Sequence, residues 1–322
     1  MTLKRYQPII EALGFTTLHS SQRLQVLWGG YGELVRLYVD STSIVVKHVQ
    51  LPQQHTHPRG WNTQRSHQRK LKSYQVELSW YNHQAEHTNA RVPKKLLVQT
   101  DGQDYLLVME DLKSVGYSEV VSTAKRQHIT ACLRWLAQFH AQYIGDQGKD
   151  LWPVGCYWHL ATRPDEFDAL QDMQLKQHAH TIDRVLTQAP YPTLVHGDAK
   201  LANFCFTPDG NQAAAVDFQY VGRGCAMKDV ALFISSAVDP ELCAQMESEL
   251  LDEYFVHLQL ALSDTQPQLC AQRVEQAWRP LFAIAWADFQ RFVKGWSPDH
   301  WKINAYTEAL TAQALETLKA YR

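Results

Sequence analysis

Three oxygen-bearing side chains, Asp198, Asn203 and Asp217, lie in or beside two short apolar runs that flank a turn. The turn contains Pro208-Asp-Gly210, and because proline presets φ and glycine accepts a positive φ, it predicts a β-hairpin. If the turn is centred near Gly210, Asn203 and Asp217 face each other across an antiparallel pair, with Cβ atoms about 5 Å apart. An amide oxygen and a carboxylate at that spacing can share one Mg²⁺ ion, which prefers oxygen ligands.

Asp198 precedes Asn203 by five residues, so it is expected in the loop that enters the same end of the hairpin. Taken singly, each of the three side chains would be interpreted as a turn cap, because short polar side chains bind backbone groups in loops. Their joint spacing instead favours convergence on one small volume. The sequence therefore predicts a magnesium site with a carboxylate beside it.

The two motifs that carry these residues resemble a known family. The string His196-Gly-Asp-Ala-Lys-Leu-Ala-Asn203, followed by Val216-Asp-Phe-Gln219, is similar to the catalytic loop and metal-binding motif of the aminoglycoside phosphotransferase and choline kinase superfamily. Its members have the fold of protein kinases. The Asp-Phe-Gln form, with Ser73-Tyr-Gln-Val-Glu77 and Trp80-Tyr81 earlier in the chain, looks most like the ecdysteroid-kinase-like branch.

That resemblance implies a role for each side chain. Asp198 would orient an acceptor hydroxyl and take its proton, while Asn203 and Asp217 would hold Mg²⁺ against the phosphates of ATP. His196 would shape the loop by packing and hydrogen bonding and would not act as a base. Lys200 would neutralise charge on the γ-phosphoryl group during transfer, with a solvated surface lysine as the alternative.

Other parts of a kinase nucleotide site occur earlier in the chain, in the expected order. Gly29, Gly30 and Gly32 lie between two predicted strands and would let backbone N–H groups approach phosphates, although glycine-rich hairpin turns are common. Lys47 ends a predicted strand and resembles the lysine that contacts the α- and β-phosphates. Alone, it would be interpreted as an edge charge.

A predicted helix from about Lys70 to His87 supplies the partner for that lysine. Glu77 on this helix would pair with Lys47, with Glu86 as a rival. The polar stretch over residues 53–72 is predicted to be a solvated loop that leads into the helix, with a phosphate-binding or acceptor-binding role as the alternative.

The segment that follows the strand over residues 105–109 resembles a kinase hinge. Its backbone would offer the carbonyl of Glu110 and the N–H of Leu112 to adenine, with Met109 lining the pocket. We place the boundary between two domains here, with a nucleotide-binding lobe over residues 1–110 and a helical catalytic and acceptor-binding lobe over residues 111–322.

Hydrophobic periodicity agrees with that division. Period-two runs over residues 24–28, 33–39 and 43–49 predict a small antiparallel sheet, whereas from about residue 122 the apolar residues recur at helical spacing. The predicted fold class is α+β, with the bilobal architecture of protein kinases: a small antiparallel-sheet lobe and a larger helical lobe.

Composition excludes several other classes of protein. The 322 residues are 45% hydrophobic and 20% charged, which is typical of a folded protein with a sizeable core. A formal net charge of −2 offers no electrostatic surface for nucleic acids or anionic membranes. No membrane span or secretory segment is evident, and the six cysteines include no Cys-x-x-Cys pair. We therefore expect a cytoplasmic protein without disulfides or structural zinc.

The acceptor side is the least determined part. Phe282, Trp286, Phe289, Val293 and Trp296 form a helical stripe that core packing largely explains, although part of it could line a pocket. Asp288 and Arg291 lie off that stripe and could face the cleft. Asp229 opens a predicted helix and is expected to cap it and to brace the catalytic loop.

The function that fits these motifs is transfer of the γ-phosphoryl group of ATP to a hydroxyl of a small organic molecule. Gln219 replaces the glycine of the protein-kinase motif, and the segment from Asp217 to Asp229 is too short for a long activation loop, so a small acceptor is favoured over a protein. Two alternatives stay open: a degenerate kinase fold that only binds a partner, and a metal-dependent phosphoesterase that uses His196, Asp198 and Asp217.

Overall fold

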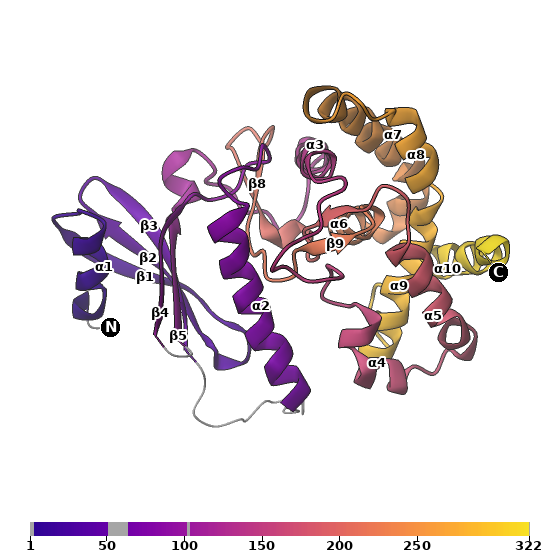
Figure 1. The fold of residues 1–322 in the computed structure, drawn as a ribbon, viewed down its shortest axis with the longest axis horizontal. Coiled ribbons are helices and arrows are strands. Elements are labelled where there is room, and N and C mark those ends of the chain that lie inside the picture. Colours follow the sequence, from indigo (N-terminus) through magenta and orange to yellow (C-terminus); the bar gives the residue numbers. More distant parts are fainter. Residues whose placement is uncertain (1–2, 51–63, 102–103, 322) are drawn as a thin grey trace.

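The computed structural model describes residues 3–50, 64–101 and 104–321. A five-stranded antiparallel sheet forms the first lobe, with the strand order β1-β2-β3-β5-β4 (Figure 1). Its strands are β1 (Leu18–Val26), β2 (Gly32–Val39), β3 (Thr42–Val49), β4 (Lys95–Asp101) and β5 (Asp104–Glu110). Strands β2, β3 and β5 confirm three predicted strands, and β1 begins and ends earlier than its predicted range. The sequence pattern does not indicate β4.

Two helices cover the two faces of the sheet, α1 (Gln7–Ala12) and α2 (Gln64–His83) (Figure 1). Successive strand residues point to opposite faces, and β5 shows this directly. Val108 packs in the cluster that contains Ile9 and Ile10 of α1, whereas Leu107 and Met109 pack in the cluster that contains residues of α2. Helix α2 begins and ends earlier than the predicted range of 70–87, so the predicted loop over 53–72 is wrong from Gln64 on, and residues 53–63 lie outside the described residues.

The second lobe is mostly helical and also contains two short antiparallel ladders, β6 with β9 and β7 with β8. Its helices are α3 (Arg126–Gln142), α4 (Pro164–Ala169), α5 (Met173–Thr187), α6 (Met227–Ala237), α7 (Pro240–Thr265), α8 (Ala271–Trp278), α9 (Leu281–Trp296) and α10 (Ala305–Thr317). The short strands are β6 (Thr193–Val195), β7 (Phe204–Phe206), β8 (Ala213–Ala215) and β9 (Gly222–Gly224). Single 3₁₀ turns are η1 (Leu3–Tyr6), η2 (Trp28–Gly30), η3 (Leu112–Val115), η4 (Leu160–Thr162), η5 (Leu201–Asn203) and η6 (Leu318–Tyr321).

Helix α9 is the central helix of this lobe and packs against α4, α5, α6 and α10. Every residue from Leu281 to Val293 is buried, which is the pattern of a helix surrounded by other elements. The aromatic stripe over these residues therefore belongs to the core.

Asp288 and Arg291 are also fully buried, which corrects the expectation that they face the cleft. Asp288 lies 2.9 Å from Arg291 and 3.0 Å from Lys228 of α6. It also accepts a hydrogen bond from the indole of Trp158 at 3.0 Å. Lys228, Asp288 and Arg291, named the Asp288 cluster below, thus join two core helices.

All six cysteines are free thiols, and four of them are buried, as expected for apolar packing positions. No helix in the described part of the chain has both the length and the apolar character needed to cross a bilayer. The division into a nucleotide-binding and an acceptor-binding domain at residue 110 stays a prediction.

Candidate active site

Lys47, on β3, ends in a buried ion pair that joins three elements. Its Nζ donates to both carboxylate oxygens of Glu77 on α2, at 2.8 and 2.7 Å, and to Oδ1 of Asp217 at 3.1 Å. The predicted Lys47–Glu77 pair is thus present, while Glu86 is exposed and pairs with Lys95 at 3.7 Å. Lys47, Glu77 and Asp217, named the Lys47 cluster below, connect the sheet, helix α2 and the loop after β8.

The charges of this cluster shift one another's pKa values. Burial lowers the pKa of Lys47, but the carboxylates of Asp217 and Glu77 outweigh it and raise that pKa overall. Burial would raise the pKa of Asp217, yet Lys47 and two further lysines hold it well below its usual range. Both groups are therefore charged at neutral pH, as a site for phosphates and a cation requires.

Helix α2 brings a second cation and a hydroxyl to the same place. Lys70 donates to Oε1 of Gln219 at 2.8 Å, and Ser73 donates to that oxygen at 3.2 Å. Gln219 in turn donates from Nε2 to Oδ1 of Asp217 at 2.6 Å. The sequence prediction placed Lys70 in a solvated loop and gave Ser73 no role in the site, although Lys70, Ser73 and Glu77 have the i, i+3, i+7 spacing of one helix face. Burial lowers the pKa of Lys70 to about 8.

The catalytic-loop residues also converge. Lys200 donates to Oδ2 of Asp198 at 2.8 Å, and Asn203 donates from Nδ2 to the same oxygen at 3.1 Å. The other carboxylate oxygen, Oδ1 of Asp198, is buried and has no hydrogen-bond partner among the described residues. Burial raises the pKa of Asp198, and the ammonium of Lys200 opposes that rise. An unpaired buried carboxylate oxygen is costly, which suggests a ligand hydroxyl as its partner.

Asp229 binds the backbone of this loop. Its carboxylate accepts hydrogen bonds from the backbone N–H groups of His196 at 2.5 Å and Gly197 at 2.9 Å. The expected bracing role is thus confirmed, but the expected helix cap is wrong, because Asp229 lies in the first turn of α6 and directs its carboxylate to the loop. Gly197 has φ +77 and a Cβ there would lie 2.2 Å from the carbonyl oxygen of Tyr220, so only glycine fits.

The hairpin forms as predicted, but its register differs by one residue. Phe204 pairs with Ala215, and the N–H of Val216 donates to the carbonyl of Asn203 at 2.9 Å, so Asn203 faces Val216 and not Asp217. A one-residue slip would turn Asp217 to the wrong face of a continued strand. The strand instead ends at Ala215, and the left-handed conformation of Asp217, with φ 71, aims its carboxylate at Lys47.

The glycine-containing turn, η2 and the residues after it, lies near the Lys47 cluster. The rings of Tyr31 and of Tyr74 on α2 are tilted at 42° with centroids 6.2 Å apart, and the Tyr74 ring lies 5.8 Å from Nζ of Lys47. Gly32 has φ +127 and passes so close to β3 that a Cβ would lie 2.0 Å from the carbonyl oxygen of His48. Gly29 and Gly30 also have positive φ.

The predicted hinge links the last strand of the sheet to η3. Met109 and Leu112 are buried, with 8% and 6% exposure. The side chain of Glu110 pairs with Arg91 at 2.7 Å, and Asp111 binds Arg36 of β2 at 2.6 Å. These contacts fix the connection between the lobes, and the contact of Glu110 and Leu112 with adenine stays a prediction.

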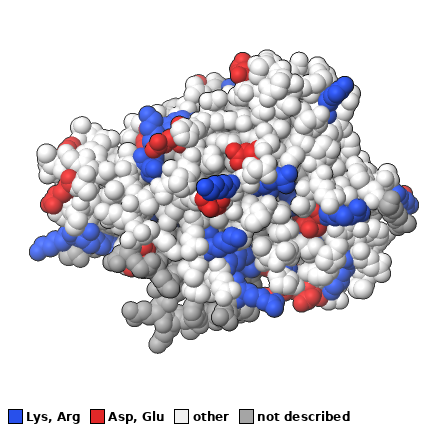
Figure 2. All heavy atoms as spheres, viewed as in Figure 1, with Lys and Arg blue, Asp and Glu red and all other residues white. Residues whose placement is uncertain are grey.

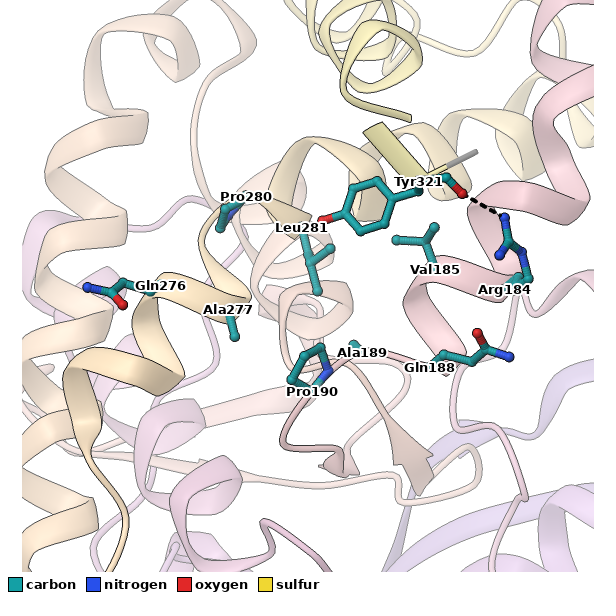
Figure 3. A pocket seen from close by; sticks show the side chains of 10 residues that line it. All are labelled: Arg184, Val185, Gln188, Ala189, Pro190, Gln276, Ala277, Pro280, Leu281 and Tyr321. Atoms are coloured by element: carbon teal, nitrogen blue, oxygen red, sulfur yellow. Dashed lines mark hydrogen bonds between the residues drawn. The ribbon is translucent and has the colours of Figure 1, made fainter. Parts of the chain in front are cut away.

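Two further features of the molecule are the distribution of its surface charges and one cavity. Figure 2 shows acidic and basic side chains interspersed on one face of the molecule. A cavity of about 270 Å³ lies between α5, the junction of α8 with α9, and η6 (Figure 3). Its lining includes Arg184, which donates to the carbonyl of Tyr321 at 3.0 Å, and none of the predicted site residues.

Comparison with known structures identifies the fold. The macrolide 2′-phosphotransferase type I has a TM-score of 0.53 with this chain at 13% identity, and the match covers 97% of this chain and 96% of that one. An ethanolamine kinase from Plasmodium vivax has a TM-score of 0.52 at 13% identity, covering 95% and 85%. The protein therefore has the bilobal kinase-like fold of such phosphotransferases, which confirms the predicted fold class.

The sequence places the chain within a family. The model of the phosphotransferase enzyme family matches residues 35–267, which contain the Lys47 cluster and the whole catalytic loop. The chain belongs to this family, so the predicted superfamily is confirmed, whereas the ecdysteroid-kinase-like branch stays a prediction. No curated protein matches the chain by sequence.

Proposed function

We propose that this phosphotransferase moves the γ-phosphoryl group of ATP to a hydroxyl of a small organic molecule, with the aid of Mg²⁺. The observation that carries the proposal is the Lys47 cluster. It unites a strand of the first lobe, helix α2 and the loop after β8 in the second lobe. Its Asp217 lies close enough to Asp198 for the charge of Asp217 to raise the pKa of Asp198. A purely structural ion pair would not need a neighbouring unpaired carboxylate.

Lys47 is the group that would hold the α- and β-phosphates of ATP. Glu77 binds its ammonium through both carboxylate oxygens, which limits the side chain to one position. The glycine-containing turn beside Tyr31 and Tyr74 would cover the phosphates with backbone N–H groups. In this proposal the first lobe, residues 1–110, binds the nucleotide.

The residues for Mg²⁺ fit its preference for hard oxygen ligands. Among the described residues, the hydrogen bonds to the Asp217 carboxylate go to Oδ1, so Oδ2 is left to bind a cation. Asn203 uses its amide nitrogen toward Asp198, which leaves Oδ1 of Asn203 as the second ligand. When bound, Mg²⁺ would neutralise charge on the phosphate oxygens.

Asp198 and Lys200 would act on the reacting groups. The hydroxyl oxygen of the acceptor forms a bond to the γ-phosphorus, the bond to the β–γ bridging oxygen breaks, and the hydroxyl proton passes to Asp198. The unpaired Oδ1 is the oxygen available to receive that proton. Lys200 stays near the developing charge through its bond to Oδ2, so positioning and electrostatics supply most of the rate enhancement.

The phosphoesterase alternative fits less well. His196 uses Nε2 toward the carbonyl of Val216 at 3.0 Å, and its Nδ1 accepts from the N–H of Asp198 at 3.2 Å, so neither nitrogen is directed at a metal. Within the described ranges, no three His, Cys, Asp or Glu side chains come together as a metal-binding group. The scaffold alternative would have no need for Lys47, Asp198, Asn203 and Asp217 together.

Two variants test the proposal. Asp217→Ala is expected to abolish the Mg²⁺-dependent thermal stabilisation by ATP, because it removes the carboxylate ligand. Asp198→Asn is expected to keep ATP binding but to lower the rate of ATP hydrolysis by about 10²–10⁴-fold, the usual contribution of a general base. Asp209→Asn, in the exposed turn of the same hairpin, is the matched control and should change neither measurement.

The outcomes separate the three functions. Stabilisation by Mg²⁺ and ATP with no hydrolysis in the unmodified protein would favour the scaffold. Hydrolysis of phosphate esters with no response to ATP would favour the phosphoesterase. Full hydrolysis of ATP by Asp198→Asn would remove Asp198 from its proposed role.

A further inference from the structure

The connection between α9 and α10 brings Lys302 to the catalytic loop. Nζ of Lys302 donates to Ser235 Oγ at 2.9 Å, near the end of α6. The next residue, Ser236, accepts a hydrogen bond from the N–H of Leu201 at 2.8 Å, and Leu201 directly follows Lys200. A lysine more than one hundred residues away in sequence is therefore anchored next to the loop that carries Asp198.

The backbone around Lys302 is firmly held. Its carbonyl accepts hydrogen bonds from Nε2 of Gln290 and from Oγ1 of Thr307, both at 3.0 Å. Its N–H donates to Nδ1 of His300 at 3.1 Å. Contacts on both sides of the residue fix the direction of the side chain, as a binding residue requires.

The Lys302 ammonium has no ion-pair partner in the part of the chain that the structure describes. Among the described residues, no acidic side chain lies within ion-pair distance of Lys302. By contrast, Lys294 on the preceding helix α9 has two acidic partners. Burial lowers the pKa of Lys302 to about 8, and the charge of Asp198 is the first to oppose that shift. A desolvated cation with only a hydroxyl as its hydrogen-bond partner gains stability from an anionic ligand.

Aromatic rings form the remaining surroundings of the ammonium. Nζ of Lys302 lies 5.2 Å from the ring of Phe289 and 5.4 Å from that of Trp301. Trp301 is 58% exposed and stacks on His300 at 5.6 Å. Ring faces attract a cation but carry no net charge, so they leave the positive charge of Lys302 unbalanced.

We propose that Lys302 binds an anionic group, a carboxylate or a phosphate, on the acceptor whose hydroxyl meets Asp198. This proposal rests on the proposed phosphotransferase function and adds the class of acceptor: a hydroxylated small molecule with a negative charge. Lys200 lies close enough for its charge to act on Lys302, so a polycationic acceptor would meet two like charges. The acceptor lobe thus selects against aminoglycoside-like cations.

Matched pairs of acceptors test the charge preference. The intact protein would be given Mg²⁺ and radiolabelled ATP with glycerol or D-glycerate, D-glucose or D-glucuronate, and benzyl alcohol or para-hydroxymethyl benzoate, with kanamycin as the cationic probe. We expect transfer to at least one anion, at a kcat/KM about tenfold or more above its neutral partner, which corresponds to about 1.4 kcal/mol.

Variants at Lys302 test the residue itself. Lys302→Met keeps the apolar stem and Lys302→Gln keeps a polar end, and both are expected to raise KM for the anionic acceptor by about tenfold while changing kcat less. Lys302→Arg, which keeps the charge, should recover most of the affinity. Lys319→Met, at an exposed lysine of η6, is the control and should behave as the unmodified protein.

Each result decides the proposal. Preference for the neutral or cationic probes, transfer to no anion, or an unchanged KM in both neutral variants would overturn it. If the unmodified protein does not hydrolyse ATP in the absence of any acceptor, that result would instead count against the phosphotransferase function. The two failures are therefore distinguishable.

Discussion

The Lys47 cluster and the Asp288 cluster each pair a buried lysine with a carboxylate, yet they differ in how accessible that carboxylate is. Asp288 is fully buried between two core helices, in ordinary helical conformation. The Asp217 side chain is 35% exposed and stands at φ 71, at the meeting point of both lobes. Burial of charge alone therefore does not mark a functional site. A charged group that stays accessible, in an uncommon conformation that neighbouring elements impose, is the more informative sign.

The largest expected effect is on stability and concerns the Asp288 cluster. Asp288→Asn leaves Lys228 and Arg291 buried without a carboxylate, which should lower the free energy of unfolding by about 3–5 kcal/mol in urea titrations. The pKa of Asp288 is lowered to about 2, so its ionised form stabilises the fold. That contribution is present at neutral pH and should be lost as the pH falls from about 4 toward 2.

Asp217→Asn is the matched variant in the other cluster. Lys47 keeps Glu77 as a partner, and asparagine tolerates a positive φ, so the loss of stability should be clearly smaller than for Asp288→Asn. An equal loss in both variants would show that the Lys47 cluster is as structural as the Asp288 cluster.

A smaller effect is expected on nucleotide affinity. Glu77→Gln removes the carboxylate that holds Lys47 and should raise KM for ATP by roughly tenfold, since hydrogen bonds to charged groups contribute about 1.5–3 kcal/mol. Glu86→Gln is the control, because Glu86 is the rival glutamate, is exposed and lies just beyond the end of helix α2. If both variants have the same KM for ATP, Glu77 does not position Lys47.

The smallest effect is a shift in pH dependence. Asp198 must be ionised to accept a proton, burial raises its pKa, and the charge of Lys200 lowers it. Lys200→Met should therefore raise the pKa of Asp198 further and move the acidic limb of the kcat profile to higher pH. Lys200→Arg keeps the charge and should leave that limb in place. If the pH profile of Lys200→Met does not move, the charge of Lys200 does not influence the ionisation of Asp198.

Much of the site could be predicted from sequence because its parts are local motifs. The turn at Pro208-Asp-Gly210 predicts the hairpin, since its residue types restrict φ directly. The predicted register is wrong by one residue because the sequence pattern does not reveal that the strand ends at Ala215 and that Asp217 adopts a left-handed conformation. Such a conformation is imposed by surrounding contacts and has no local signature in a non-glycine residue.

By itself, the sequence determined which residue types could bind phosphate and magnesium, their order along the chain, and the change from sheet to helical periodicity. Tertiary structure alone decided that Glu77 and not Glu86 meets Lys47, that Asp288 and Arg291 lie in the core, and that Lys302 reaches the catalytic loop. The physical reason is that turns and periodicity depend on neighbours a few residues apart. Pairing between distant side chains depends on which faces bury together, and that is settled only when the whole core packs.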